Sequence, residues 1–250
     1  MKSANTSKNI ARNLPQRKMD TTLLRIGGFE PFSTVDYPGR LAAVIFCQGC
    51  PLRCGYCHNP DLIPARSAGQ LTFEHVLWAI ARRKEFLDAV VFSGGEPLAQ
   101  AALIPAMASM RARGFEVGLH TAGTNPSLFE AALPFLDWVG FDVKAAFDDY
   151  RKVTGADVGE KARASLKILV TSGVPYEVRT TVWPGRIGKT EICVMASMLR
   201  EMGVRRYVLQ EARTPDQKAW PGDDMLQDPA FLSDTAAMFD QFEVRRAEIV

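Results

Sequence analysis

The sequence has few of the features that mark a membrane or secreted protein. Its longest uninterrupted apolar run, "LAAVIFC" (41–47), is far shorter than the roughly 20 residues that cross a bilayer. The polar stretch 1–20 contains no apolar core of a secretory signal. The chain has only five cysteines, an odd number, and four of them lie within 47–57, which makes a poor disulfide framework. We therefore expect a cytoplasmic protein in a reducing compartment, with no membrane partner.

The chain also lacks a strong overall charge. The formal net charge is +2, but residues 1–25 hold six Lys or Arg against one Asp, so the positive excess is N-terminal. A nucleic-acid-binding arm or a transit peptide can have this composition, but a solvated tail has it more commonly. We expect residues 1–21 to be a disordered basic tail and residues 22–250 to be one domain. Nucleic acid is not an expected partner.

Apolar, β-branched runs alternate with segments of helical periodicity along the rest of the chain. The predicted strands are 41–46, 89–92, 115–119, 138–143, 176–182 and 205–210. The predicted helices are 72–87, 98–113, 125–133, 160–172, 189–202 and 230–242. Six β-then-α units predict an α/β fold with parallel strands, either a partial barrel or an open doubly wound sheet. In both folds, the loops after the strand ends line the active face.

The stretch "CQGCPLRCGYCHNP" (47–60) holds the cysteine cluster and can be divided in two ways. Two CxxC pairs suggest zinc, but only three residues separate them, whereas zinc knuckles usually come from distant segments. The alternative is a triad, Cys50-x3-Cys54-x2-Cys57, which suits an iron–sulfur cluster with one open iron. Cys47 continues a predicted strand, so we expect it in the core. Cys193 stands alone on a predicted helix, and we expect it to be a core residue too.

With Tyr56 directly before its last cysteine, the triad resembles the signature of the radical S-adenosylmethionine (SAM) superfamily. The longer segment "STVDYPGRLAAVIFCQGCPLRCGYCHNPDLI" (33–63) resembles the glycyl-radical-enzyme activating proteins. Within that family it is most similar to those that activate anaerobic ribonucleoside-triphosphate reductase, and pyruvate formate-lyase activating enzyme is a cousin. The resemblance implies a partial (β/α)6 TIM-type barrel, in agreement with the six units counted above.

The resemblance also implies the cofactors, the reaction and the partners. Cys50, Cys54 and Cys57 would hold a [4Fe-4S] cluster, with S-adenosyl-L-methionine at the open iron. Reductive cleavage of this cofactor gives a 5'-deoxyadenosyl radical, which generates a glycyl radical on the partner enzyme. The implied partner is anaerobic ribonucleotide reductase, and the implied electron donor is a carrier such as flavodoxin or ferredoxin.

Seven further residues are implied to bind the cofactor: Tyr56, Gly94, Gly95, Glu96, Asp142, Lys144 and Arg179. The "SGGEP" segment (93–97) would contact the cofactor's amino group. Two adjacent glycines expose backbone N–H groups and admit a ligand closely, although a turn that needs positive φ also explains them. Asp142 and Lys144 are two apart on a strand, so they share a face, as in a surface ion pair or beside the cofactor's carboxylate.

Three positions depart from the cousin's pattern or stay without a firm role. His120 stands where the cousin has an aspartate that helps bind a monovalent cation, so no such cation is predicted here. We expect His58, which follows Cys57, to pack against the cysteine loop. At Gln210 and Glu211 the cousin's active-site histidine is absent, so the group that orients the cofactor's sugar is not assigned.

Two other functions remain open from the sequence. A radical enzyme that acts on a small molecule would share the triad and its surroundings. A zinc-dependent nucleic-acid-binding module would use the two CxxC pairs and the basic tail. The metal content of the protein distinguishes the second possibility from the others, because only a cluster protein contains iron and sulfide.

Overall fold

The computed structural model describes residues 23–67, 71–214 and 225–246, so the expected tail at 1–21 lies outside the described residues. A single eight-stranded sheet runs through the described part of the chain, in the order β1 to β8. The strands are β1 Ile26–Ser33, β2 Ala42–Cys47, β3 Ala89–Gly94, β4 Glu116–Thr121, β5 Trp138–Asp142, β6 Tyr176–Val182, β7 Arg206–Glu211 and β8 Gln241–Arg245. All neighbouring pairs are parallel except β1 with β2.

The order of the strands decides between the two folds that the sequence left open. Neighbours in the sheet are also neighbours in the sequence, so successive crossovers all advance in one direction and place their helices on one face. A doubly wound sheet would reverse its strand order at a switch point. The fold is therefore an α/β partial barrel, and β1 and β8 are its two edges among the described residues.

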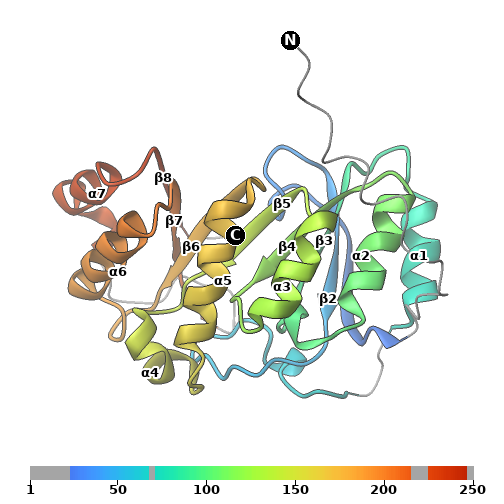
Figure 1. The fold of residues 1–250 in the computed structure, drawn as a ribbon, viewed down its shortest axis with the longest axis horizontal. Coiled ribbons are helices and arrows are strands. Elements are labelled where there is room, and N and C mark those ends of the chain that lie inside the picture. The colour runs from blue at the N-terminus through green and yellow to red at the C-terminus, as the bar shows by residue number, and fades with distance from the viewer. Residues whose placement is uncertain (1–22, 68–70, 215–224, 247–250) are drawn as a thin grey trace, which may run out of the picture.

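The helices cover this outer face in succession. They are α1 Phe73–Ala81, α2 Leu103–Ala112, α3 Pro126–Ala132, α4 Tyr150–Thr154, α5 Gly159–Ser172, α6 Lys189–Glu201 and α7 Pro229–Ala236. Figure 1 shows α1, α2, α3, α5 and α6 in front of the strands, and the short α4 at the lower edge of the molecule. No helix in the described part of the chain is long and apolar enough to cross a membrane.

Alternation along the strands divides the apolar residues between the two faces of the sheet. Val90 and Phe92 of β3 pack into the main core beneath the helices, together with residues such as Leu103 and Met107. Val91, between them, belongs to a smaller cluster on the concave face with Tyr37 and Trp138. The Tyr37 and Trp138 rings lie 5.2 Å apart, so the loop between β1 and β2 closes the floor of the barrel.

Local signals in the sequence explain where several helices begin. The Thr72 side chain accepts a hydrogen bond from the N–H of His75 and so caps α1. The Asn125 side chain accepts one from the N–H of Leu128, and Pro126 occupies the first turn of α3. Several other helices begin or end at residues that differ from the predicted bounds.

Two predicted helices are shorter than their apolar periodicity suggested. The helix predicted at 72–87 ends at Ala81, because the Arg83 side chain bonds the carbonyl of Ala79 and the chain then turns toward β3. The helix predicted at 98–113 begins at Leu103, after a 3-10 turn at Pro97–Ala99. Pro97 favours that turn because its ring fixes φ and it has no N–H to donate.

The C-terminal prediction was wrong in part. The helix expected over 230–242 stops at Ala236, and Gln241–Arg245 forms β8 against β7. Phe242 and Val244 of β8 pack on the core, while the charged residues that alternate with them, Glu243 and Arg245, face the concave side. The sequence analysis also missed β1 and α4, which are described above.

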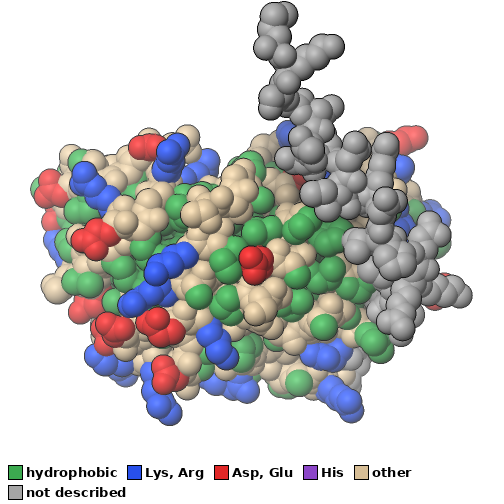
Figure 2. Space-filling model, viewed as in Figure 1, with side chains coloured by type: hydrophobic (Ala, Val, Ile, Leu, Met, Phe, Trp, Pro, Cys, Tyr) green, Lys and Arg blue, Asp and Glu red, His purple; other side chains and the backbone are tan. Residues whose placement is uncertain are grey.

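The helix-covered face is mixed in character. Figure 2 shows hydrophobic side chains most often over the centre of this face and charged side chains gathered toward α4 and α6. Cys193 lies on α6 and is exposed, so the expectation that it belongs to the core was wrong. The buried face of α6 is formed by Ile192, Met195, Ala196 and Leu199, and Cys193 lies outside that set.

Candidate functional site

The cysteine loop begins at the end of β2 and is held by backbone hydrogen bonds to distant segments. Cys47 is the last residue of β2 and is fully buried, as expected for a core residue. The N–H groups of Gly49 and Cys50 donate to the carbonyls of Leu62 and Ile63, at 2.8 and 3.1 Å. These bonds fold the loop back on its own C-terminal side, so Cys50 is placed by backbone rather than by side-chain contacts.

A second set of contacts attaches the loop to the far half of the barrel. The N–H of Arg53 donates to the carbonyl of Thr154 at the end of α4, at 2.7 Å. His58 accepts a hydrogen bond at Nε2 from the N–H of Arg213, just after β7, at 3.2 Å. His58 therefore ties the loop to β7, and burial lowers the pKa of its ring, which favours the neutral form that accepts this bond.

The three predicted ligands Cys50, Cys54 and Cys57 are partly exposed on this loop, whereas Cys47 is not. No three His, Cys, Asp or Glu side chains in the described ranges converge closely enough to share one metal ion. A single zinc needs such convergence, but a cubane cluster presents a separate iron to each thiolate. The donor set therefore fits a cluster better than zinc. Burial raises the pKa of Cys50 to about 12, so this thiol loses its proton when metal binds.

The glycine pair of the "SGGEP" segment packs directly against the cysteine loop. Gly94 has a φ of +107°, and a Cβ there would lie 2.5 Å from the backbone nitrogen of Cys47. A Cβ on Gly95 would lie 2.5 Å from the carbonyl oxygen of Gly49. The N–H of Gly95 donates to the carbonyl of Cys47 at 2.9 Å, and that of Glu96 to the carbonyl of Gly49 at 3.0 Å. Exposed N–H groups were predicted for Gly94 and Gly95, and the N–H of Gly95 is not free, because it binds the cysteine loop as that of Glu96 does.

Glu96 is buried, and its carboxylate connects two neighbouring loops. It accepts hydrogen bonds from the Thr121 hydroxyl at 2.6 Å, the Ala122 N–H at 2.8 Å and the Leu98 N–H at 3.0 Å. Burial raises the pKa of this carboxyl, although the three donors oppose the rise. The protein itself satisfies the carboxylate, and its partners Thr121, which ends β4, and Ala122, which follows it, were not assigned from the sequence.

Asp142, Lys144 and Arg179 form one largely buried ionic group, at the end of β5 and beside it on β6. Asp142 and Arg179 are register partners, and Nε of Arg179 lies 2.7 Å from Oδ1 of Asp142. Nζ of Lys144 lies 3.0 Å from the other carboxylate oxygen. Burial alone would raise the pKa of Asp142, but the two cations outweigh it and hold that pKa well below its usual range. One carboxylate thus faces two cations, which leaves a positive excess at this edge.

The Tyr56 side chain connects the cysteine loop with this ionic group. Nζ of Lys144 is 5.7 Å from the Tyr56 ring centroid, within the range of a cation–π contact. The Tyr56 hydroxyl is buried and has no hydrogen-bond partner among the described residues, so it retains a donor for a ligand. The ring also packs edge-on against Trp183 at 5.6 Å, and a side chain at Gly55 would collide with that indole. Trp183 was missed, although the "WPG" sequence after the fifth predicted strand marked its loop.

His120 lies on the concave face, and both nitrogens of its ring have partners. Nε2 is 2.8 Å from the backbone carbonyl of Asp36, so it carries the proton and donates it. Nδ1 is 3.2 Å from the Ser93 hydroxyl and therefore accepts. Burial, with help from the nearby Arg179, lowers the pKa of His120 to about 3, so the ring is neutral. His120 thus joins the loop between β1 and β2 to the end of β3. Neither of its ring nitrogens is free to bind a ligand.

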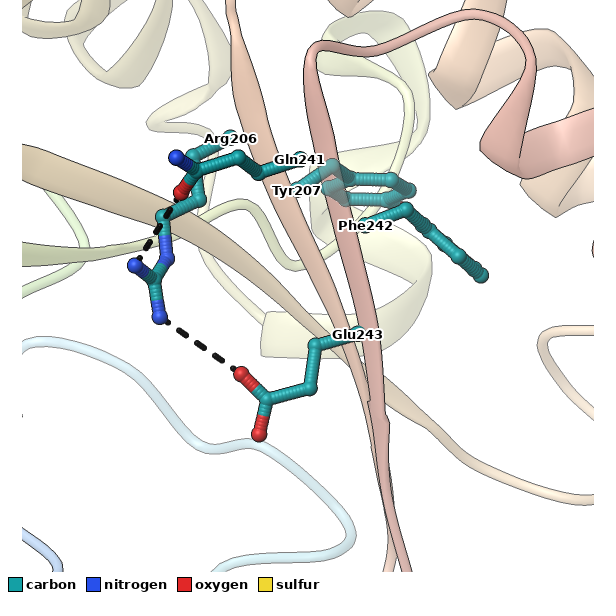
Figure 3. A pocket seen from close by; sticks show the side chains of 5 residues that line it. All are labelled: Arg206, Tyr207, Gln241, Phe242 and Glu243. Carbon is teal, nitrogen blue, oxygen red and sulfur yellow. Dashed lines mark hydrogen bonds and ion pairs between the residues drawn. The ribbon is translucent and has the colours of Figure 1, made fainter.

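A second charged group on the concave face lies away from the cysteine loop. Glu177 is fully buried and accepts two hydrogen bonds from Arg245 of β8, at 2.7 and 2.8 Å. Figure 3 shows the adjoining pocket of about 240 Å³, where Arg206 reaches Gln241 and Glu243. This pocket lies at the first residues of β7 and β8, the strand ends opposite the cysteine loop, and its arginine is already paired. We assign it a role in holding β8 to the sheet.

The remaining predicted positions, Gln210 and Glu211, end β7 at the same edge as the cysteine loop and are partly buried. The candidate site is thus the strand-end edge of the barrel. It brings together the cysteine triad, Tyr56, the glycine pair and the Asp142 ionic group, which come from β2, β3, β5 and β6.

Comparisons with known proteins agree with this arrangement. The family model described as the radical SAM superfamily matches residues 44–192. A Methanocaldococcus jannaschii protein, named as a glycyl-radical enzyme activating enzyme, is 31% identical over 199 residues, or 76% of this chain and 81% of its own. The pyruvate formate-lyase-activating enzyme of Clostridium pasteurianum is 36% identical over 167 residues, 64% of this chain and 69% of its own. A radical SAM methyltransferase from Sphaerobacter thermophilus shares the fold, with a TM-score of 0.65 at 18% identity over 84% of this chain and 67% of that one.

Proposed function

Because this chain belongs to the radical SAM superfamily, and within it to the glycyl-radical-enzyme activating enzymes, we propose that it generates a glycyl radical on a partner enzyme. The observation that carries the proposal is the cysteine loop. Its three partly exposed cysteines lie on one loop at the end of β2, while Cys47 is buried. This geometry suits a cluster with one iron left for S-adenosylmethionine.

The cofactors supply the radical chemistry, and the chain supplies binding and position. When bound, a [4Fe-4S] cluster with S-adenosylmethionine supplies one-electron cleavage of the sulfonium, and with it hydrogen-atom abstraction from a glycine Cα. Cys50, Cys54 and Cys57 would hold the cluster. Lys144, kept charged by Asp142, would meet the cofactor's carboxylate, and the Tyr56 hydroxyl would donate to a polar atom of the cofactor.

The backbone of the glycine pair also helps to form this binding site, because it is bonded to the cysteine loop. With the N–H groups of Gly95 and Glu96 bonded to the cysteine loop, the segment fixes the distance between that loop and the end of β3. We assign Gly94, Gly95 and Glu96 to shaping the cofactor site, and Arg179 to holding Asp142 beside Lys144. Together these contacts would hold the cofactor in a fixed position beside the cysteine loop.

Two observations bear on the partner. The names of the curated relatives favour an enzyme of the pyruvate formate-lyase type. The segment 33–63 favours anaerobic ribonucleoside-triphosphate reductase, by its resemblance to the activators of that enzyme. In both cases the substrate is a glycine in a loop of a large protein, and the electron comes from a carrier such as flavodoxin or ferredoxin.

Electron paramagnetic resonance tests the proposal and its two partner candidates together. The reconstituted protein is incubated anaerobically with reductant and S-adenosylmethionine, alone or with either candidate enzyme. We expect a glycyl doublet with one partner and none without S-adenosylmethionine. Cys54→Ala should abolish the signal, while Cys193→Ala, which changes an exposed cysteine on α6, should not.

Three results would contradict the proposal. Near-stoichiometric zinc without iron or sulfide in anaerobically purified protein would exclude a cluster. Deoxyadenosine formation with no protein radical in either partner would indicate a small-molecule substrate. Full signal in Cys54→Ala would show that the cysteine triad does not carry the reaction.

A further inference from the structure

Arg25 precedes β1 and is fixed on both sides by backbone hydrogen bonds. Its N–H donates to Oε1 of Gln100 at 2.8 Å. Its carbonyl accepts from the N–H of Gln48 at 2.9 Å and from Nε2 of Gln100 at 3.1 Å. Gln100 in turn donates to the carbonyl of Gln48. The main chain of Arg25 is therefore held against Gln48, which lies between Cys47 and the first predicted cluster ligand.

The guanidinium of Arg25 reaches the next residue of the cysteine loop. A terminal nitrogen of Arg25 lies 3.7 Å from the position that a Cβ on Gly49 would take. Gly49 directly precedes Cys50, and its φ of +101° turns the backbone there. A side chain at Gly49 would also approach the backbone of Ala65, at 3.4 Å. Both distances are ordinary contacts, so they place the guanidinium next to Gly49, beside the cysteine loop.

This guanidinium has no partner within the described ranges. Its Nε is buried and makes no hydrogen bond, and none of the ion pairs found in the described part of the chain includes Arg25. Other enclosed arginines are paired, as Arg179 is with Asp142 and Arg245 with Glu177. Burying part of an unpaired cation is costly, so a counter-charge is expected next to it.

A cluster on the cysteine triad would supply that counter-charge. Three thiolates leave a [4Fe-4S] unit with net negative charge, and one-electron reduction makes the unit more negative. A fixed cation beside it favours the reduced form, and the effect is strong where water is excluded. The buried carboxylate of Glu96 is bonded to Thr121 and Ala122 and makes no ion pair with Arg25.

We propose that Arg25 is a positioning residue for the electron-transfer step, whose charge raises the reduction potential of the cluster. The inference rests on the proposed function, because it needs the cluster, but it does not depend on which enzyme is the partner. Arg25 touches no reacting atom. It acts through the electrostatic field of its positive charge, which lies beside Gly49 and Cys50.

A redox titration followed by electron paramagnetic resonance tests the inference without any partner enzyme. The variants are Arg25→Gln, which removes the charge, and Arg25→Lys, which keeps it. The control is Arg82→Gln, which removes a surface arginine that stacks on Trp78 of α1, away from the cysteine loop. Iron content is measured for each variant, so that a shifted potential is not confused with a lost cluster.

We expect the ratio of reduced to oxidised cluster at a fixed potential to fall about tenfold in Arg25→Gln, a midpoint lower by about 59 mV. Arg25→Lys and Arg82→Gln should stay close to the wild type. An unchanged midpoint in Arg25→Gln, or an equal fall in Arg82→Gln, would overturn the inference. If Arg25→Gln cannot hold a cluster, the result for Arg25→Lys decides. A wild-type midpoint in Arg25→Lys supports the role of the charge. Loss of the cluster in Arg25→Lys as well refutes that role.

The same data separate this inference from the proposed function. If no partner ever acquires a glycyl radical but Arg25→Gln still shifts the midpoint, the proposed function fails and the role of Arg25 stands. If the radical forms but the midpoint of Arg25→Gln does not move, the proposed function stands and the role of Arg25 fails.

Discussion

Replacing Gly95 by alanine should disrupt the contact between β3 and the cysteine loop. The added Cβ would lie 2.5 Å from the carbonyl oxygen of Gly49, 2.9 Å from its carbonyl carbon and 3.0 Å from the carbonyl oxygen of Leu62. All three are backbone atoms, which cannot rotate away as a side chain can. One of the two backbone segments must therefore move.

The cost can be worked out from these contacts. Overpacking in a close-packed interior costs about 1–3 kcal/mol. The shift would also weaken the bonds from Gly95 to Cys47 and from Glu96 to Gly49, each worth about 0.5–1.5 kcal/mol. We expect a loss of about 2–6 kcal/mol in the free energy of unfolding. For a chain of this size the melting temperature would fall by about 4–24 °C.

Urea denaturation of the metal-free protein measures this loss, and iron content after reconstitution measures the damage to the ligand loop. The matched control is Gly28→Ala in β1, where a Cβ would meet only Phe46, at 3.4 Å. That contact is ordinary, so the control should stay within about 1 kcal/mol of the wild type. A Gly95→Ala protein within about 0.5 kcal/mol of the wild type, with full iron content, would refute the argument.

Three further predictions concern other parts of the molecule. Cys47→Ala should keep the wild-type iron content while Cys54→Ala loses it, and equal losses in an iron and sulfide assay would refute the triad. With its pKa lowered to about 3, His120 stays neutral in the fold but binds a proton in the unfolded chain below about pH 6.5, so its stabilisation is complete above that pH and is lost on acidification. Urea titrations from pH ~6 to ~4 should show the metal-free wild type losing up to about 1.4 kcal/mol per pH unit more than His120→Gln, and parallel slopes would contradict this. Arg245→Met should lower the free energy of unfolding by about 3–5 kcal/mol, because it removes the bidentate partner of the buried Glu177, and adding Glu177→Met should restore most of it; a double variant as unstable as the single one would contradict this.

Much of the barrel could be predicted because its signals are local. Thr72 and Asn125 cap their helices with their own side chains, and the six strands β2–β7 are apolar runs flanked by polar loops. The edge strand β1, "IGGFEPFS", contains two glycines and a proline and is only partly buried. Its strand conformation comes from antiparallel pairing with β2, which no local pattern reveals.

The positions of the site residues could be predicted, but their partners could not. Cys50, Cys54, Cys57 and the glycine pair are recognisable because each motif is contiguous in the sequence. The ion pair between Asp142 and Arg179 depends on the register of β5 with β6, which the sequence does not encode locally. The exposure of Cys193, in contrast, agrees with the helical spacing of α6. Its apolar positions 192, 195, 196 and 199 form one face, and position 193 lies outside that face.

The contacts of the cysteine loop also set the order in which the protein can be assembled. Arg53 is bound by Thr154, and His58 by Arg213, a partner 155 residues further along the chain. Contacts between such distant segments form late in folding, because long loops must close before they are made. A chain still emerging from the ribosome lacks β7 and cannot complete the ligand loop. We therefore expect a cluster to be inserted after translation, once β7 is in place and the ligand loop is complete.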